Sequence, residues 1–310
     1  MAFLYALPGA VAEGLIWGLM AIGVYISYKI LDIADLTVDG SICTGGCVCA
    51  VLLANGAPVW LCVLAAFLAG ALTGVVTGLF HTALGIPAIL AGILTQLILY
   101  SVNLTILGGK SLAAVDPRAN RLLLHMSDNP SAIVAGILIV TATIVGLWLF
   151  FYTEIGLTLK STGDNPHMSR AQGVNVKLNT VVGLALANAI VALAGALLAQ
   201  YKGSANINDG RGAIVIALAA IHIGLSVSLK IKPNFVCSLI GVVCGGVVYY
   251  IIYNLVILFG LKTDFLKMLS ALIVAVFLAV PYLKAEYFTD KKALHAQAKA
   301  ARHGGGDGNG

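Results

Sequence analysis

Acidic side chains within apolar segments are the first candidates for chemistry, because an ionisable group in a membrane is costly and is usually kept for function. Such acids occur here only at segment edges, at Glu13, Asp39 and Asp209. A carrier driven by a proton or sodium gradient would more often place a carboxylate deep inside a span. The positions of these acids therefore weigh against ion coupling.

Polar groups inside or at the ends of apolar segments form a second set of candidates: Gln96, Asn103, Asn188 and Gln200. Each could line a passage or bridge two helices, and bridging is the commoner role. His222 is in the middle of a span, where a polar contact between helices is expected. The six cysteines all lie in apolar runs without histidines at zinc-site spacing, so we expect them to serve packing.

Catalytic motifs are absent from the sequence. Gly109-Lys110-Ser111 resembles the end of a phosphate-binding loop, but Leu104 stands where that motif needs a glycine. No His-Glu-x-x-His pair or Gly-x-Ser-x-Gly elbow occurs. We therefore expect no catalytic residue, no metal ligand and no cofactor bound by this chain.

The composition points to the elements that position these residues. The chain is 60% hydrophobic and 10% charged, against about 25% charged residues in soluble domains. No Asp, Glu, Lys or Arg occurs between Gly40 and Gly109. No Lys or Arg precedes Lys29, so a cleavable signal peptide is not expected. We predict an all-α polytopic membrane protein.

The sequence predicts about eight or nine transmembrane helices within a membrane domain spanning 1–285, followed by a disordered cytoplasmic tail, 286–310. The first half covers about 10–107 and the second about 180–285, with a cytoplasmic loop at 153–179. The bias of Lys and Arg favours an N-terminus outside and a C-terminus inside. The apolar segments are 11–28, 41–54, 59–80, 82–107, 132–152, 180–200, 212–229, 235–259 and 266–283.

The two halves contain similar links. Residues 33–40 and 204–210 each contain Ala, then Asp or Asn, an aliphatic residue, a short polar link and Asp-Gly, and an apolar segment follows. An odd number of spans separates them, which predicts inverted repeats with interrupted helices. The N-termini of the following helices, at Asp39-Gly40 and Asp209-Gly210, could face a carboxylate, or each Asp could cap its own helix. Asn206 belongs to the second link and joins the candidate pathway residues.

Small residues are expected to let the helices approach closely. Gly70, Gly74 and Gly78 are spaced four residues apart on one segment. Alanines line one side of a later segment, at Ala185, Ala189, Ala192, Ala196 and Ala199.

The loop Thr153–Asn179 is the only long polar interval in the middle of the chain, and it contains a Gly-Asp-Asn-Pro turn. Within it we predict a short helix from about Pro166 to Gln172, capped by Asp164 or Asn165. Basic residues would favour an acidic surface on a cytoplasmic partner. A solvated loop whose charge only sets topology is the alternative.

This loop resembles the cytoplasmic coupling segment of permeases in the branched-chain amino-acid and ribose type of ABC importers. Gly156-Leu157, Gly163-Asp164-Asn165 and Ala171-Gln172-Gly173 match that pattern, whereas Lys160 stands where Arg is usual. Within the group, Leu36-Thr37-Val38-Asp39-Gly40 and similar stretches resemble permeases ascribed to tryptophan or related aromatic amino acids. His222 departs from those permeases.

The resemblance implies a non-enzymatic permease subunit of the bacterial inner membrane that imports a small solute, by preference an amino acid. It implies a second permease copy, a cytoplasmic P-loop ATPase that binds ATP and Mg²⁺, and an extracytoplasmic solute-binding protein. An ion-coupled carrier or channel is the main alternative, and a non-transporting scaffold is the second. The residues expected to couple to the ATPase are Glu154, Gly163, Asp164, Asn165, Met168, Arg170 and Gly173.

Overall fold

Helices make up most of the computed structural model, which describes residues 2–115, 122–124, 129–231 and 234–258, and single positions between 268 and 279. Contacts divide the chain into two units, Met1–Thr263 and Asp264–Gly310. In the second unit the described positions are helical, and the predicted tail 286–310 lies outside them. The first unit contains α1 (Ala2–Tyr25), a π-helix (Ile26–Ile30), α2 (Val38–Ala54), α3 (Val59–Thr82), α4 (Ala88–Ile106), β1 (Leu112–Ala114), α5 (Asn129–Phe151), α6 (Glu154–Asp164), α7 (Pro166–Ala171), α8 (Val176–Lys202), β2 (Ser204–Asn206), α9 (Ala213–Ile231) and α10 (Phe235–Leu258).

Six of the described helices, α1, α3, α4, α5, α8 and α10, are long and apolar enough to cross a membrane, and α2 and α9 are shorter apolar helices. This confirms the predicted all-α polytopic fold; the exception is a small antiparallel sheet in which β1 pairs with β2. The predicted segment 82–107 began too early, because Gly85 adopts a φ of +70° and Pro87 precedes the first turn of α4. Of the predicted span 266–283, the structure describes only 268, 271–272, 274–276 and 279.

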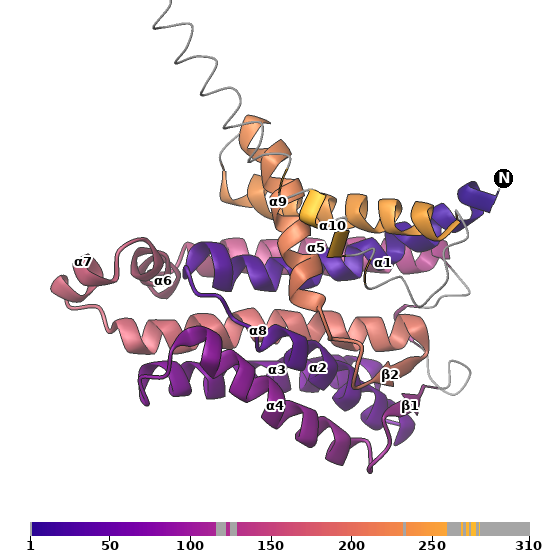
Figure 1. Ribbon diagram of the computed structural model, residues 1–310, viewed down its shortest axis with the longest axis horizontal. Helices are drawn as coiled ribbons and strands as arrows, with labels where there is room; N and C mark the ends of the chain where they lie inside the picture. Colours follow the sequence, from indigo (N-terminus) through magenta and orange to yellow (C-terminus); the bar gives the residue numbers. More distant parts are fainter. Residues whose placement is uncertain are drawn as a thin grey trace, which may run out of the picture. The chain divides into compact units, whose positions relative to one another are not determined.

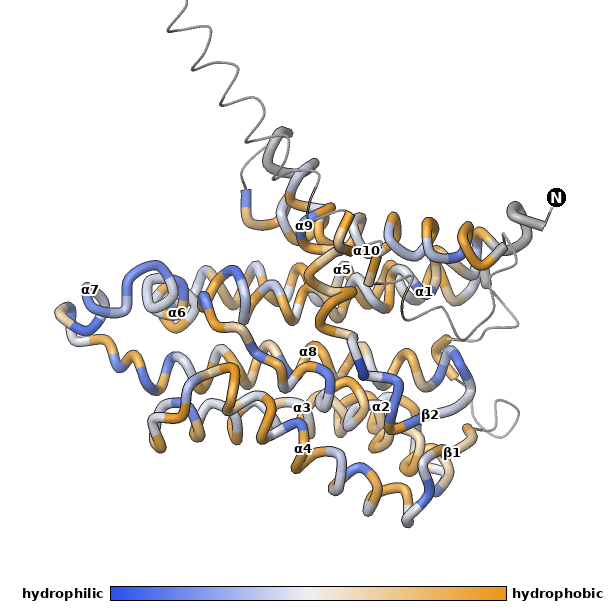
Figure 2. Tube along the Cα trace, viewed as in Figure 1, coloured by the Kyte–Doolittle hydropathy of each residue, from blue (hydrophilic) through white to orange (hydrophobic). Residues whose placement is uncertain are grey.

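Helix α8 lies among α1, α2 and α3, while α10 packs against α1 and α9 (Figure 1). Helices α6 and α7 lie at one end of this bundle, and β1 and β2 lie at the other. Figure 2 shows hydrophilic residues gathered at α6 and α7 and again near β2, with apolar residues along the helices between them. The polar segments thus mark the two ends of the spans.

Glycines bring α2 and α3 into close contact with α8. A methyl group on Gly45 would overlap the carbonyl oxygen of Ala192, and one on Gly74 would overlap that of Leu184. A methyl group on Gly70 would overlap the side chain of Ala192 and the carbonyl oxygen of Asn188. The predicted close approach of helices at these small residues is therefore confirmed, and the structure shows that the glycine ladder of α3 packs against α8.

Two breaks in the helices approach each other from opposite ends of the bundle. After α1, the chain passes through the π-helix beside α6 and returns through residues 31–37 to the start of α2. Helix α8 ends beside β1 and β2, and the chain returns through turns to α9 (Figure 1). The two links meet where Gly210 lies against the carbonyl oxygen of Asp39. Two inverted copies with interrupted helices would produce such an arrangement, and the repeat itself stays a prediction.

A buried network of side-chain hydrogen bonds holds the first break. Asn188 Nδ2 of α8 donates to Asp35 Oδ2 at 2.6 Å, and the backbone N–H of Thr37 donates to Asp35 Oδ1 at 2.9 Å. Ser41 Oγ donates to Asn188 Oδ1 at 2.6 Å and lies 2.7 Å from Thr73 Oγ1. The network joins the link to α2, α3 and α8, so the irregular backbone is enclosed by protein.

Asp35 corrects the expectation that acids occur only at the edges of segments. Its side chain is 2% exposed and bonds to the middle of α8. A second chain of hydroxyl groups runs beside it, from Thr37 to Thr77 at 2.7 Å and from Thr77 to Thr95 at 3.0 Å. Both carboxylate oxygens of Asp35 already accept hydrogen bonds, which is the arrangement of a group that holds structure together.

Replacing Gly45 or Gly146 with alanine should change stability in opposite directions. At Gly45 the added methyl meets the backbone of α8, whereas at Gly146 of α5 nothing lies within 4 Å. Gly45→Ala should lower the free energy of unfolding by about 1–3 kcal/mol. Gly146→Ala should raise it by up to about 1 kcal/mol, because alanine favours a helix. Thermal unfolding of the purified protein in detergent measures both; equal shifts would contradict the packing.

Asn188→Leu should be far more destabilising than Asn254→Leu. The first change leaves the Asp35 carboxylate and Ser41 without their partner, at a cost of about 3 kcal/mol or more. Among the described residues Asn254 bonds to Tyr250 of its own helix, so its loss should cost about 0.5 kcal/mol. The same unfolding assay compares the two variants. Similar losses would show that the network does not hold the break.

Candidate functional site

A cavity of about 410 Å³ opens between the start of α2, one face of α4 and the turn that precedes α9. Four of the predicted pathway residues line it: Asp39, Gly40, Gln96 and Asn103. Tyr100 and Arg211, which were not among the predicted pathway residues, also line it. The volume of this cavity lies within the usual range for small-ligand pockets, about 300–1,000 Å³.

Asp39 holds one wall of this cavity in place. Its carboxylate oxygens accept hydrogen bonds from the backbone N–H groups of Gly212 and Ile214, each at 2.9 Å. Asp39 therefore caps α9, in the other half of the chain, and not its own helix α2 as one of the predicted alternatives had it. Cys43 adds a second contact, because its Sγ accepts from the N–H of Gly210 at 3.1 Å.

Two polar groups on the cavity wall stand out. The guanidinium carbon of Arg211 lies 6.0 Å from the centre of the Tyr100 ring, a distance at which a cation is attracted to an aromatic face. The side chain of Asn103 is 1% exposed, and its amide oxygen has no hydrogen-bond partner in the described part of the chain. Arg211 was missed because, in sequence, it reads as one more loop charge that sets topology.

The remaining predicted pathway residues connect elements and do not line this cavity. Asn188 belongs to the buried network, and Gln200 accepts from the N–H of Leu123 at 3.1 Å. Asn206 lies in β2, where its side chain accepts from the N–H of Asn208, and Asp209 pairs with Lys202 at 3.8 Å. Asn188 matches the bridging alternative, and so does Gln200, whose Nε2 donates to Cys49 Sγ of α2 at 3.5 Å. Asn206 and Asp209 instead make contacts within or next to their own link.

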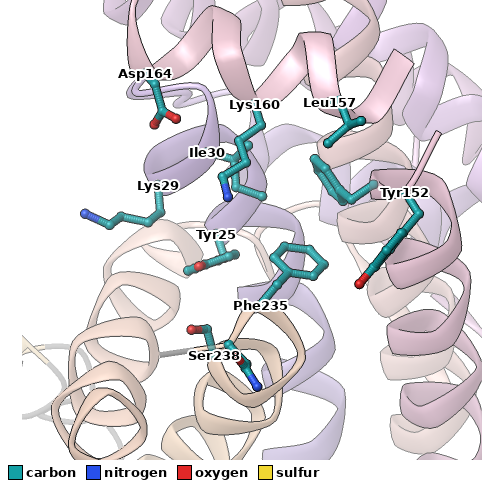
Figure 3. A pocket seen from close by; sticks show the side chains of 11 residues that line it. Tyr25, Lys29, Ile30, Tyr152, Leu157, Lys160, Asp164, Phe235 and Ser238 are labelled. Carbon is teal, nitrogen blue, oxygen red and sulfur yellow. The ribbon is translucent and has the colours of Figure 1, made fainter. Parts of the chain in front are cut away.

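A second cavity, of about 420 Å³, lies at the opposite end, where α1, α5, α6 and α10 meet. Tyr25, Tyr152 and Phe235 contribute aromatic walls, and Lys29 and Lys160 contribute positive charge. The side chain of Lys160 extends from α6 toward the space between Tyr25 and Phe235 (Figure 3). The two cavities thus lie toward opposite ends of the spans.

Helix α6 forms one wall of this second cavity and packs on the π-helix that follows α1. A methyl group on Gly163 would overlap the carbonyl oxygen of Ile30, at the last position of the π-helix. Asn179 of α8 donates to Thr162 Oγ1 at 3.2 Å, which ties α6 to α8 as well. These residues were predicted to be loop. In the structure they form a helix that Thr153 caps, because its Oγ1 accepts from the N–H of Gly156 at 3.3 Å.

The short helix predicted from Pro166 to Gln172 is present as α7, one residue shorter at its end. Asn165 caps it by accepting from the N–H of Met168 at 3.0 Å, so Asn165 and not Asp164 fills that role. Met168 is 61% exposed, and Arg170 is also exposed. Gly173, with a φ of +85°, ends the segment in a conformation that favours glycine. Glu154 lies exposed in the first turn of α6.

His222 does not bridge two helices through a hydrogen bond in the described structure. Its Nδ1 lies 2.8 Å from the carbonyl oxygen of Leu218 in the same helix, and its ring centre lies 6.2 Å from that of Tyr28. The expected contact between helices is thus limited to the neighbouring ring. The described residues contain no group of three or more His, Cys, Asp or Glu that could hold a metal ion.

Residues 9–281 match the family model described as the permease component of the branched-chain amino acid transport system. The tyrosine transport system permease protein of Clostridioides difficile is 36% identical over 269 residues, covering 86% of this chain and 88% of the relative. The fructose import permease protein FruF of Bifidobacterium longum is 26% identical over 86% of this chain and 76% of its own length.

The galactose/methyl galactoside import permease protein MglC of Escherichia coli is 28% identical over 68% of each chain. No solved structure matches the chain.

Proposed function

This chain belongs to the family of permease components of branched-chain amino acid transport systems, and we propose that its own substrate is an amino acid, with aromatic amino acids favoured. The chain is thus the membrane-spanning subunit of an ABC import system. The tyrosine transport permease supports the amino-acid assignment, since it is the most nearly identical of the three relatives and spans nearly the whole chain. The import permeases for sugars match with lower identity.

We infer the partners from the same family and from the exposed residues of α6 and α7 at one end of the bundle. A cytoplasmic P-loop ATPase binds ATP and Mg²⁺ and contacts α6 and α7, and this chain binds no cofactor itself. An extracytoplasmic binding protein delivers the substrate to the opposite end. A second permease copy, identical or different, completes the pathway. The exposed Met168 and Arg170 support the ATPase contact, because apolar and Arg side chains are enriched at protein interfaces.

The distribution of charge supports an orientation with α6 and α7 in the cytoplasm. Lys29 and Lys160 lie together at the second cavity, and Arg170 and Lys177 lie in or next to the short helices α6 and α7. Gly9 near the start of α1 lies beside Tyr201 at the far end of α8. The N-terminus is then extracytoplasmic and the C-terminus cytoplasmic, in the bacterial inner membrane.

One contact carries the proposed mechanism: Gly163 of α6 against the carbonyl of Ile30. A movement of α6 driven by the ATPase would press on the π-helix and on the link that follows it. Asp35 and Thr37 connect that link to α8 and to the start of α2. There Asp39 holds one wall of the first cavity, the one lined by α4 and Arg211, which we call the outer cavity. The two cavities would therefore open and close in turn.

Ion-coupled transport is the rival function, and Asp35 is the one observation that favours it. Its buried carboxylate lies where such a carrier would place one. However, Thr37 and Asn188 already donate to both of its oxygens, and no cation is needed to satisfy them. Uptake that persists after loss of the ATPase would favour the rival.

Mass spectrometry of the proteins that co-purify with this chain from its native membrane, in mild detergent, tests the assembly. We expect an equimolar P-loop ATPase, because α6 and α7 leave an exposed docking surface for one. Recovery of the folded chain alone would contradict the proposal and favour ion-coupled transport.

Arg170→Glu should uncouple ATP hydrolysis from uptake without unfolding the helices. The reversed charge lies on the exposed end of α7, so uptake should fall at least about tenfold while thermal unfolding stays unchanged. Gly173→Glu should act in the same direction, with added backbone strain because of the positive φ. Lys110→Glu, the same charge reversal at the opposite end, is the matched control. Wild-type coupling in Arg170→Glu would remove α7 from the interface.

A further inference from the structure

Arg211 brings an uncompensated positive charge to the outer cavity. The only ion pair between side chains in the described part of the chain is Lys202–Asp209, so Arg211 is left without a carboxylate there. The nearest acid on the cavity wall, Asp39, accepts two backbone hydrogen bonds from α9 instead. The guanidinium is held over the Tyr100 ring, which leaves its N–H groups available to an anion.

The position of Arg211 is built into the fold. Gly210 packs so closely on α2 that a side chain there would overlap the carbonyl oxygen of Asp39. On the other side, the N–H of Gly212 donates to the Asp39 carboxylate. Arg211 lies between these two anchored residues, so its backbone cannot drift away from the cavity.

Asn103 supplies the complementary group. Its amide oxygen is a buried acceptor without a donor among the described residues, which is unfavourable unless a ligand satisfies it. Gln96, Tyr100 and Asn103 are four and three residues apart, so they share one face of α4. The acceptor therefore lies one turn from the ring that supports Arg211.

We propose that Arg211 and Asn103 form a subsite for the charged head of a free amino acid. The guanidinium of Arg211 binds the carboxylate, and Asn103 Oδ1 accepts a hydrogen bond from the ammonium group. Leu97 and Ile207 offer an apolar wall for the side chain. This inference rests on the proposed import of amino acids and deepens it by naming the groups that recognise the substrate. A sugar carries neither charge and would leave Arg211 without an anion.

Three ligands that share a phenyl group but differ in their charged groups distinguish the contact of Arg211 from that of Asn103. L-phenylalanine has both charges, 3-phenylpropionate lacks the ammonium group, and phenethylamine lacks the carboxylate. Binding of each to the full chain in lipid nanodiscs is measured by saturation-transfer difference NMR, which detects millimolar affinities. Wild type, Arg211→Gln, Asn103→Leu and the control Lys110→Gln are compared, and thermal unfolding confirms that each variant is folded.

The expected result is a crossed pattern. Arg211→Gln should weaken L-phenylalanine and 3-phenylpropionate by about tenfold to a hundredfold, the value of a hydrogen bond to a charged group. It should leave phenethylamine unchanged. Asn103→Leu should weaken L-phenylalanine and phenethylamine and spare 3-phenylpropionate. Lys110→Gln should match wild type, because Lys110 is exposed at the same end and does not line the cavity.

Three outcomes would overturn the subsite: no binding of any ligand to the wild type, equal weakening of all three in Arg211→Gln, or no difference between Arg211→Gln and Lys110→Gln. Uptake of labelled L-phenylalanine and galactose by cells that express the chain tests the proposed function separately. Amino-acid uptake with a failed binding pattern would reject the subsite alone. Uptake of galactose without any amino acid would reject the proposed substrate.

Discussion

The hydrogen bond between Asp35 and Asn188 is the interaction on which the rest of the architecture depends. A membrane offers no water to satisfy a broken helix, so every freed polar group must find a partner inside the protein. The chain breaks after α1 and returns to the middle of the bundle, where Asn188 of α8 meets the carboxylate of Asp35. Close glycine–alanine packing brings α8 near enough for this contact.

The same constraint explains how two halves of the chain form one site. Asp39 lies in the first turn of α2 but caps the N-terminus of α9, while Asn188 of the second half holds Asp35 in the link before α2. The cavity beside it is therefore shaped by both links at once. At the far end, α6 rests on the π-helix that leads into the first link, so a displacement there has a continuous covalent and hydrogen-bonded route to the cavity.

The sequence predicted those features that depend on neighbours along the chain. Apolar runs predicted the spans, the spacing of Gly70 and Gly74 predicted close packing, and the polar loop predicted α7, with its cap left open between Asp164 and Asn165. Asp35 was overlooked because a residue in a link gives no sign of a partner on α8. Arg211 was counted only as a loop charge for the same reason. Helix α6 was missed because it is polar, and its buried residues Leu159 and Thr162 face α8 and not neighbours along the chain.

The separation between bonded partners also has a consequence for how the protein is made. Asp35 lies 153 residues before Asn188, and Asp39 lies 175 residues before Ile214. During synthesis, which proceeds from the N-terminus, both acids leave the ribosome long before the groups that satisfy them. The early helices therefore pass through a stage in which two acids lack their final partners. We therefore expect the first half of the chain to stay in contact with the insertion machinery until α8 and α9 have been synthesised.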